Sequence, residues 1–211
     1  MELQRTANAG ILLKLDGVSI LLDGLCDRIE PYVETPANMA QALQNDPPDL
    51  LVFTHSHGDH CSQSLVSAFQ KQNLRPILGP EALPYGTEHR KVKVGSVTVT
   101  PIPSRHIGKY DITHYSYLIE GSRKIFFAGD AAPLQWKGKE IVLDVLIAPF
   151  AYANTKPAWQ WSCSVASQIV IVHLPEKEND PVNLWQQVEN ATEGEYRSRL
   201  LTPRIGEILT L

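Results

Sequence analysis

Cysteine is scarce in this sequence, and the few cysteines present form no pattern. Cys26, Cys61 and Cys163 are odd in number, lie far apart and include no C-x-x-C pair. This excludes a disulfide framework and argues against a thiolate metal site. We therefore expect a reducing compartment, the cytoplasm.

Long apolar runs are missing as well. No stretch approaches the roughly 20 residues that a membrane-spanning helix needs. The N-terminal segment MELQRTANAG has no apolar core of the kind that a signal peptide carries. We expect no membrane contact. Internal repeats and low-complexity segments are also lacking, and the length fits a single domain over residues 1–211.

Positive charge is not in excess either. Lys and Arg number 19 against 23 Asp and Glu, a formal net charge of −4. No overall basic field therefore draws the protein toward nucleic acid, and we expect a small-molecule substrate instead. Whether the protein forms a homo-oligomer stays an open question at this point. With 43% hydrophobic residues the chain can bury a core unaided, so a bound metal would serve chemistry rather than folding.

Turn signals divide the chain into short strands and helices. Asp16-Gly17, Gly95-Ser96 and residues 121–123 predict three hairpin turns. Helices are predicted over residues 36–45, where Thr35 is the expected cap, over 62–72 and over 180–190. Strands are predicted over residues 10–15, 18–22, 49–53, 75–78, 91–94, 97–102, 115–120, 124–128, 142–147, 168–172, 199–202 and 207–211. Helices spread among so many strands favour an α/β fold with two packed sheets and helices outside.

One short segment gathers side chains that can bind a metal. His55, His57, Asp59 and His60 lie within THSHGDH, residues 54–60. Neither a regular strand nor a helix would bring all four to one point, so the segment must be a turn after the strand over 49–53. Gly58 is the expected source of conformational freedom. Imidazole and carboxylate ligands suit zinc, manganese or iron. The ordinary alternative is a polar, histidine-rich surface turn.

This segment resembles the HxHxDH signature of the metallo-β-lactamase superfamily. Other motifs of that family follow in its order: Asp23 after a hairpin, His106 in PSRH, Asp130 in FFAGD, and His173 at the end of an apolar run. The resemblance implies a four-layer αββα sandwich, with two mixed β-sheets and helices outside. The short interval between Asp130 and His173 has no room for a further domain. The chain is in this respect similar to the compact branch that contains ascorbate-6-phosphate lactonase.

The resemblance also implies a ligand set for two divalent cations. Zinc is the expected metal, with manganese or iron(II) as alternatives. The first ion would take His55, His57 and His106; the second would take Asp59, His60 and His173; Asp130 would lie between them and Asp23 would support the loop. Two cations that share a water lower its pKa toward neutrality, which implies hydrolysis by a metal-bridged hydroxide.

The predicted catalytic residues are Asp59 and His114. His114 precedes the strand over 115–120 and is a candidate for substrate contact or proton transfer, although its position taken alone favours a structural role. Arg105, Lys109 and Tyr110 are candidates for binding an anionic substrate, with a solvated surface loop as the alternative. The aromatic segment over 152–161, with Tyr152, Lys156, Trp159 and Trp161, is predicted to be a loop at a cleft wall or a dimer contact, with burial in the core as the alternative.

The predicted substrate is a small, anionic ester, lactone or phosphodiester. Two alternatives stay open. One is a phosphodiesterase or nuclease acting on RNA ends, which the net charge disfavours. The other is a non-enzymatic, metal-binding member of the fold, which the full ligand set disfavours.

Overall fold

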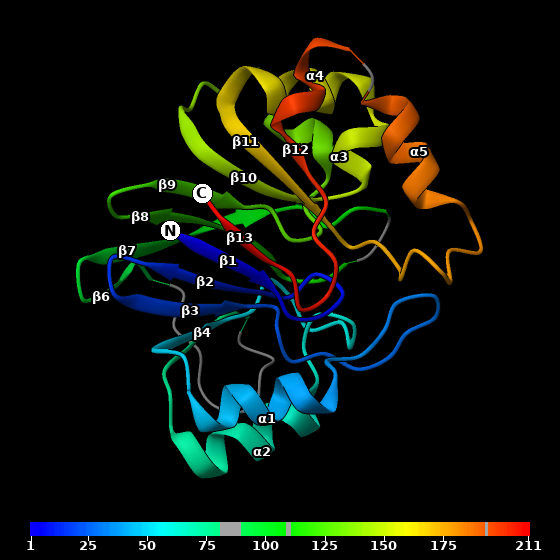
Figure 1. The fold of residues 1–211 in the computed structure, drawn as a ribbon. Coiled ribbons are helices and arrows are strands. Elements are labelled where there is room, and N and C mark those ends of the chain that lie inside the picture. The colour runs from blue at the N-terminus through cyan, green and yellow to red at the C-terminus, as the bar shows by residue number, and fades with distance from the viewer. Residues whose placement is uncertain (81–89, 109–110, 193) are drawn as a thin grey trace.

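Two β-sheets pack face to face and carry helices on both outer faces (Figure 1). This computed structural model describes residues 1–80, 90–108, 111–192 and 194–211. The first sheet has six strands in the order β13-β1-β2-β3-β4-β5. Their bounds are β1 Glu2–Arg5, β2 Ile11–Leu15, β3 Val18–Leu22, β4 Leu50–Val52, β5 Ile77–Leu78 and β13 Ile208–Thr210.

The second sheet has seven strands in the order β12-β11-β10-β9-β8-β7-β6. Their bounds are β6 Val92–Val94, β7 Val97–Ser104, β8 His114–Glu120, β9 Lys124–Phe127, β10 Leu143–Pro149, β11 Ala166–Val172 and β12 Leu200–Leu201. Strands β9 to β12 run parallel, whereas β6 to β9 are antiparallel neighbours. Both sheets are therefore mixed, because β3, β4 and β5 are also parallel within the first.

Helices form the outer layers. Helices α1 (Ala37–Asn45) and α2 (Gln63–Asn73) cover the first sheet, and α3 (Ala151–Asn154), α4 (Lys156–Val165) and α5 (Leu184–Ala191) cover the second (Figure 1). Two short 3-10 helices, Pro133–Trp136 and Glu195–Arg199, complete the elements. The predicted αββα sandwich is confirmed.

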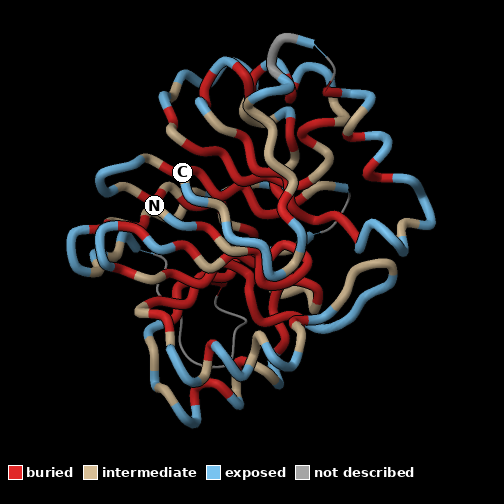
Figure 2. Tube along the Cα trace, in the orientation of Figure 1, coloured by how far each residue is buried: buried red, intermediate tan, exposed pale blue. Residues whose placement is uncertain are grey.

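Three apolar layers hold the four structural layers together (Figure 2). Between the sheets lie alternate residues of the strands, such as Leu13, Ile20 and Val170. The opposite faces of the same strands pack on the helices, as Leu51 does on α2 and Ile169 on the α3–α5 layer. Burial on both faces explains why the strands read as nearly continuous apolar runs.

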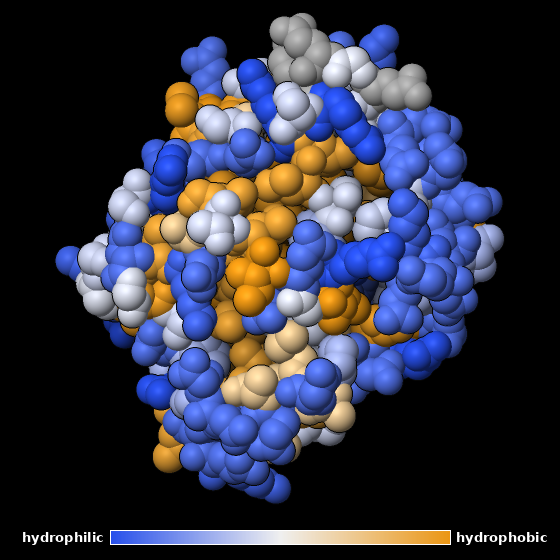
Figure 3. All heavy atoms as spheres, viewed as in Figure 1, coloured by the Kyte–Doolittle hydropathy of each residue, from blue (hydrophilic) through white to orange (hydrophobic). Residues whose placement is uncertain are grey.

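The side of the sandwich that carries both chain ends exposes part of the core between the sheets. Figure 3 shows a band of apolar side chains across this face, with hydrophilic side chains over the helices on either side of it. Met1, Leu201, Leu209 and Leu211 are partly buried and pack against the inter-sheet core. In the described part of the chain, no helix is long and apolar enough to span a membrane.

Some predicted elements are wrong in detail. The segment between β10 and β11 is not a loop but helices α3 and α4. Helix α5 begins at Leu184 rather than near Asp180, although the Asp180 carboxylate still accepts a hydrogen bond from the Trp185 backbone N–H (2.8 Å). Strand β1 lies in a segment for which no strand was predicted.

The expected cap of α1 is also wrong. Thr35 does not cap the helix. Its hydroxyl donates instead to the Gly24 carbonyl (3.0 Å) and accepts from the Cys26 backbone N–H (2.8 Å). It thereby fastens the loop that follows Asp23. By contrast, the Ser62 hydroxyl accepts from the Leu65 N–H and caps α2 as predicted.

Candidate metal centre

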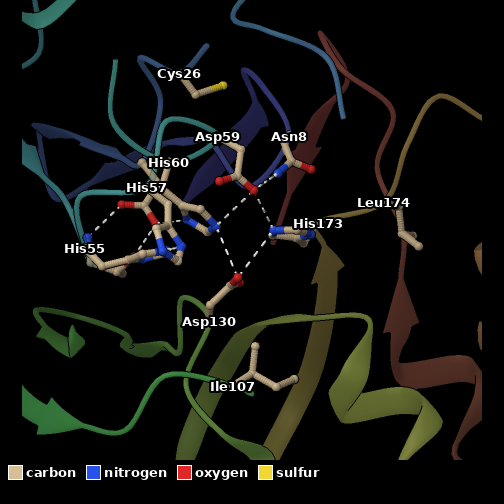
Figure 4. A network of polar contacts seen from close by, with 12 residues as sticks. Asn8, Cys26, His55, His57, Asp59, His60, Ile107, Asp130, His173 and Leu174 are labelled. Atoms are coloured by element: carbon tan, nitrogen blue, oxygen red, sulfur yellow. Dashed lines mark hydrogen bonds and ion pairs between the residues drawn. The ribbon is translucent and has the colours of Figure 1, made fainter. Parts of the chain in front are cut away.

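The chemically active side chains all follow strand ends at one edge of the sandwich. Asp23 follows β3 and the THSHGDH segment follows β4, which is parallel to it. His106 follows β7, Asp130 follows β9 and His173 follows β11, and these three strands point the same way within the second sheet. The two sheets thus deliver residues that are far apart in sequence to one place (Figure 4).

The THSHGDH segment leaves the strand and closes into a helical turn. The backbone N–H groups of His60 and Cys61 both donate to the His57 carbonyl, at 3.0 and 2.8 Å. The expectation for Gly58 is wrong, because its φ does not lie in the left-handed region. Near the centre, two residues with side chains lie in that region, Asp23 (φ 46°) and His173 (φ 59°), so the unusual backbone belongs to other segments than the motif.

Three ring nitrogens converge on one side of the centre. His55 Nε2 lies 3.1 Å from His57 Nδ1 and 3.2 Å from His106 Nε2. These three residues form one of the groups whose ligand atoms all lie within 4.8 Å of one another. The sequence assigned the same three residues to one metal.

A second group faces the first. His173 Nε2 lies 3.2 Å from Asp59 Oδ2, and His60 Nε2 lies 3.8 Å from the same oxygen. Asp130 Oδ2 lies 3.4 Å from both of these ring nitrogens and 3.8 Å from His106 Nε2 of the first group. One carboxylate oxygen therefore borders both groups, as Figure 4 shows for its contacts with His60 and His173.

These separations match the edges of metal coordination polyhedra. Ligands held about 2.0–2.1 Å from a zinc ion in tetrahedral geometry lie roughly 3.3 Å from one another. The nitrogen and oxygen separations in both groups, 3.1 to 3.8 Å, bracket that value. Neutral rings that only packed against each other would have no reason to point three nitrogens at one spot.

Hydrogen bonds on the far side of the rings decide which nitrogens carry protons. The Thr54 hydroxyl donates its one proton to Asp23 (2.6 Å), so His55 Nδ1 must donate to that hydroxyl (2.9 Å). His60 Nδ1 donates to Asp23 (2.8 Å), and His106 Nδ1 donates to the Ile107 carbonyl (2.6 Å). In His55 and His106, Nε2 is therefore a lone pair directed into the centre, and in His60 it becomes one when the ring gives up its second proton.

The inward atoms suit a cation. His60 Nε2 and Asp130 Oδ1 are buried and have no hydrogen-bond partner. The lone pairs of His55 and His106 oppose each other at 3.2 Å, an arrangement that is repulsive unless a positive charge lies between them. The donor set, imidazole nitrogens and carboxylate oxygens, fits zinc, manganese or iron(II).

The charge environment agrees with this. Burial lowers the pKa of His55 well below its usual range and also lowers the pKa of His106, so both rings are neutral. Burial also disfavours charge on His60, but Asp130 and Asp23 outweigh it and hold the pKa of this ring well above its usual range. Burial acts to raise the pKa of Asp130, yet His173 and His60 hold it well below its usual range. A bound cation would displace the extra proton of His60 and would itself neutralise the buried Asp130 carboxylate.

His114 lies beside the first group but not within it. Its ring centroid is 5.1 Å from that of His55 and 5.7 Å from that of His106. The Ser116 hydroxyl donates to the Ala128 carbonyl (2.8 Å), so Ser104 must donate to Ser116 (3.1 Å) and His114 Nδ1 must donate to Ser104 (2.7 Å). The other nitrogen, Nε2, is therefore a buried lone pair without a partner. Burial lowers the pKa of His114 to about 3, which keeps it in this state.

A pocket of about 380 Å³ opens next to His106. Arg105, Asp111 and Ile112 line it, and Arg105 is exposed. Lys109 and Tyr110, the other predicted anion-binding residues, lie outside the described residues.

The aromatic segment after β10 does not line a cleft. Tyr152, Trp159 and Trp161 are buried in the core between the second sheet and its helices, and only Lys156 of the four is exposed. The prediction of a cleft wall or dimer contact is wrong, because α3 turns the Tyr152 ring inward and α4 turns the two indole rings inward. The Trp161 indole N–H donates to the Lys139 carbonyl (3.0 Å), which satisfies its polar edge within the fold.

Three residues near the centre were not predicted. Asn8, in the loop between β1 and β2, places its side-chain amide 3.5 Å from Asp59 Oδ2. Arg5 is buried behind this loop. The Tyr32 ring packs edge-on against His173, with centroids 4.2 Å apart. No metal-binding or catalytic motif includes these residues, and only the fold brings them here.

Comparisons with known proteins bear on what this centre is. A family model described as a beta-lactamase superfamily domain matches residues 19–178, a span that includes every predicted ligand. The chain belongs to the metallo-β-lactamase superfamily. The superfamily predicted from the sequence motifs is thus confirmed, while the narrower resemblance to the lactonase-containing branch stays a prediction.

Individual members of the superfamily resemble the chain over different extents. A UPF0173 metal-dependent hydrolase of Thermoplasma acidophilum is 31% identical over 97 residues, which are 39% of this chain and 43% of that protein. The match spans less than half the length of that relative. The match therefore supports a family relationship, but it does not assign the activity of that relative to this chain.

Solved structures agree over the whole chain. A possible metal-dependent hydrolase from Veillonella parvula has a TM-score of 0.73 at 14% identity, covering 100% of this chain and 99% of that one. An isothiocyanate hydrolase from Delia radicum gut bacteria has a TM-score of 0.69 at 15% identity, with the same coverage. The metallo-beta-lactamase fold protein YhfI from Bacillus subtilis has a TM-score of 0.65 at 17% identity, and the match covers 99% of each chain. At these identities the likeness establishes the fold.

Proposed function

We propose that this protein is a metal-dependent hydrolase with two divalent cations, zinc in the first instance, acting on a small ester, lactone or phosphodiester. The observation that carries the proposal is the position of Asp130 Oδ2. It lies within 3.8 Å of ring nitrogens from both groups, so one carboxylate can serve two ions. His55, His57 and His106 would hold the first ion, and Asp59, His60 and His173 the second.

Such cations, when bound, lower the pKa of water toward neutrality and polarise the bond to be broken. The chain's own residues supply the frame. Asp23 and the Ile107 carbonyl hold protons away from the inward nitrogens of His60 and His106. Asp59 and Asp130 add the negative charge that would stabilise cations in this buried site.

We assign to His114 the role of a hydrogen-bond acceptor next to the first ion. Its Nε2 lone pair is fixed by the hydrogen-bond chain through Ser104 and Ser116, and it has no protein partner. It can accept a hydrogen bond from water or from a substrate hydroxyl at the centre. His114→Phe should lower kcat, whereas Ser116→Ala, two hydrogen bonds removed from the ring, should lower it less.

The substrate pocket favours a small molecule. Its volume of about 380 Å³ lies within the range of small-ligand sites, roughly 300–1,000 Å³. Arg105 at its wall offers a cation for an anionic group, and Asp111 limits how much negative charge the pocket accepts. A long nucleic acid would need a basic track, which the net charge of −4 does not favour.

Metal content and a substrate panel test the proposal. Gently purified protein should carry about two transition-metal ions per chain by elemental analysis. Asp130→Ala should lose metal and activity, whereas Asp144→Ala, which removes a half-buried carboxylate paired with Arg123 and distant in the fold from the ligands, should keep both. The panel should contain a lactone, an ester, a phosphodiester, an RNA end and an isothiocyanate, the last because one fold neighbour is an isothiocyanate hydrolase.

Turnover of the RNA end alone would favour the nuclease alternative. Metal binding without turnover of any member would favour a non-enzymatic role. A folded protein that refuses zinc, manganese and iron(II) would overturn the proposal itself.

A further inference from the structure

His173 differs from three of the other ligand histidines in how its ring is held. His55, His60 and His106 each donate from the second ring nitrogen, to Thr54, Asp23 and the Ile107 carbonyl. The second nitrogen of His173, Nδ1, is buried and has no hydrogen-bond partner. Ligating imidazoles are normally oriented through that nitrogen, so His173 must be oriented by other means.

The backbone of His173 supplies the first part of the answer. Its φ of 59° is unusual for a residue with a side chain and costs about 1 kcal/mol or more, so the surroundings must impose it. The His173 N–H donates to the Asn8 carbonyl at 3.2 Å. The ring is then confined by Tyr32, which packs on it edge-on.

Asn8 also touches the neighbouring ligand. Its side-chain amide points at Asp59 Oδ2, 3.5 Å away, and that oxygen is the one nearest His173 Nε2 (Figure 4). Asn8 is 1% exposed. One loop residue therefore contacts two of the three ligands assigned to the second ion, His173 through its carbonyl and Asp59 through its amide.

Arg5 holds this loop in place. Its guanidinium donates to the Asn8 carbonyl from Nε (3.2 Å) and Nη2 (2.9 Å), to the Leu174 carbonyl from Nη2, and to the Pro203 carbonyl from Nη1 (3.1 Å). The side chain is 2% exposed, and no ion pair joins it to any described carboxylate.

Burying a guanidinium without a carboxylate is costly, and burial lowers the pKa of Arg5 to about 10. What the fold gains is a rigid fork that spans three chain segments, the loop after β1, the turn after β11 and the turn after β12. A lysine ammonium has no such fork and could not satisfy all three segments.

We propose that Arg5 and Asn8 are positioning residues for the second metal. Arg5 locks the turn of His173 and Leu174 against the loop that carries Asn8, and Asn8 aligns Asp59 with His173. This inference rests on the proposed two-metal function, because it concerns the ligands of the second ion only.

Metal titration of matched variants tests the inference. The affinities of the first and second equivalents of Zn²⁺ are measured by chelator competition, and the Co²⁺-loaded proteins are compared by visible absorption. Asn8→Ala and Arg5→Lys should weaken the second equivalent about 10- to 100-fold and leave the first unchanged. Gln4→Ala is the control, since its amide also donates to the C-terminal segment, at Gly206 (3.1 Å), but reaches neither Asn8 nor His173.

The outcomes separate this inference from the proposed function. If the wild-type protein binds fewer than two ions, the two-metal function fails and this inference with it. If it binds two and both variants match Gln4→Ala, the positioning role is refuted while the metal centre stands. Equal loss of both equivalents, with a lower Tm of the metal-free protein, would indicate a purely structural role and would also refute it. Should Arg5→Lys not fold, Asn8→Ala decides, because it removes neither charge nor backbone contact.

Discussion

Replacing Asp23 with asparagine should damage the metal centre without touching a ligand. The Asp23 carboxylate is fully buried and accepts three hydrogen bonds. Oδ1 accepts from the Thr54 backbone N–H (2.8 Å), and Oδ2 accepts from the Thr54 hydroxyl (2.6 Å) and from His60 Nδ1 (2.8 Å). Every partner is a donor, so the site has no place for the NH2 group of an asparagine.

Either orientation of the new amide leaves a conflict. If its oxygen faces His60, its NH2 meets the Thr54 N–H, and a buried donor loses its acceptor at a cost of about 1–3 kcal/mol. If its oxygen faces the Thr54 N–H, its NH2 meets His60 Nδ1, and that ring must move its proton to Nε2. The proton would then occupy the atom that lies 3.4 Å from Asp130 and 3.8 Å from Asp59. We therefore expect zinc affinity to fall about 10- to 100-fold, equivalent to roughly 1.4–2.7 kcal/mol.

The assay is zinc competition with a chromophoric chelator, with Tm measured on the metal-free protein. Asp49→Asn is the matched control: its carboxylate also accepts a backbone N–H and a hydroxyl, both from Ser19 (2.9 and 3.0 Å), but at the opposite end of β3 from Asp23. Zinc affinity in Asp23→Asn equal to that in Asp49→Asn would refute the reasoning about His60. A loss of fold, visible by circular dichroism, would show that the hydrogen bonds matter more to stability than to metal binding.

Three further predictions concern the same region. Gly129→Ala should destabilise the protein by about 2–4 kcal/mol in urea unfolding, because a Cβ at φ 55° would lie 2.7 Å from the Thr54 Cβ; Gly138→Ala, at φ 76° with open space, should cost only about 1 kcal/mol, and equal losses would contradict the steric argument. Burial acts to lower the pKa of His60, but the neighbouring carboxylates act more strongly and raise it above the unfolded value. The proton on His60 therefore stabilises the metal-free fold fully below about pH 6.5, and this stabilisation is lost as the pH rises through the folded pKa. The Tm difference between zinc-loaded and chelator-treated protein should therefore widen from about pH 6 to about pH 8, and a constant difference by scanning fluorimetry would contradict it. Cys61→Ala should keep most hydrolytic activity, because burial raises the pKa of this thiol far above neutrality and it is no nucleophile; an inactive variant with intact metals would reverse that conclusion.

The sequence predicted the fold well where local chemistry decides structure. Asp16-Gly17 sets the β2–β3 turn, with Asp16 at φ 53° and Gly17 at φ 79°, and Ser62 caps α2. The prediction failed after β10, where aromatic residues suggested a loop. There α4 buries Trp159 and Trp161 against the second sheet, and this tertiary packing outweighs the poor helix propensity of the segment.

The candidate site was predictable to the extent that its residues stand in motifs. His55, His57, Asp59 and His60 are adjacent in sequence, and the distant partners Asp130 and His173 each follow a recognisable apolar strand. The supporting residues carry no such signal. The Arg5 guanidinium donates to backbone carbonyls, and Asn8 contacts His173 through its own backbone carbonyl, a group that every residue possesses. Arg5 ends β1 and Asn8 follows it, and this strand is too short and polar to be recognised from the sequence.

The charges of the centre argue for the kind of substrate it would take. Asp23, Asp59 and Asp130 are three carboxylates in a buried cluster, and their mutual repulsion in the metal-free protein is relieved by the proton on His60. Two divalent cations would bring four positive charges and displace that proton, leaving the centre with one net positive charge. An excess of one positive charge in a low-dielectric site attracts one anion, either a water-derived hydroxide or the anionic group of a substrate. Because Arg105 lies at the adjoining pocket, both charges would act on the same end of the molecule. The preference should therefore weaken as salt is added and should be strongest for substrates whose anionic group lies close to the scissile bond.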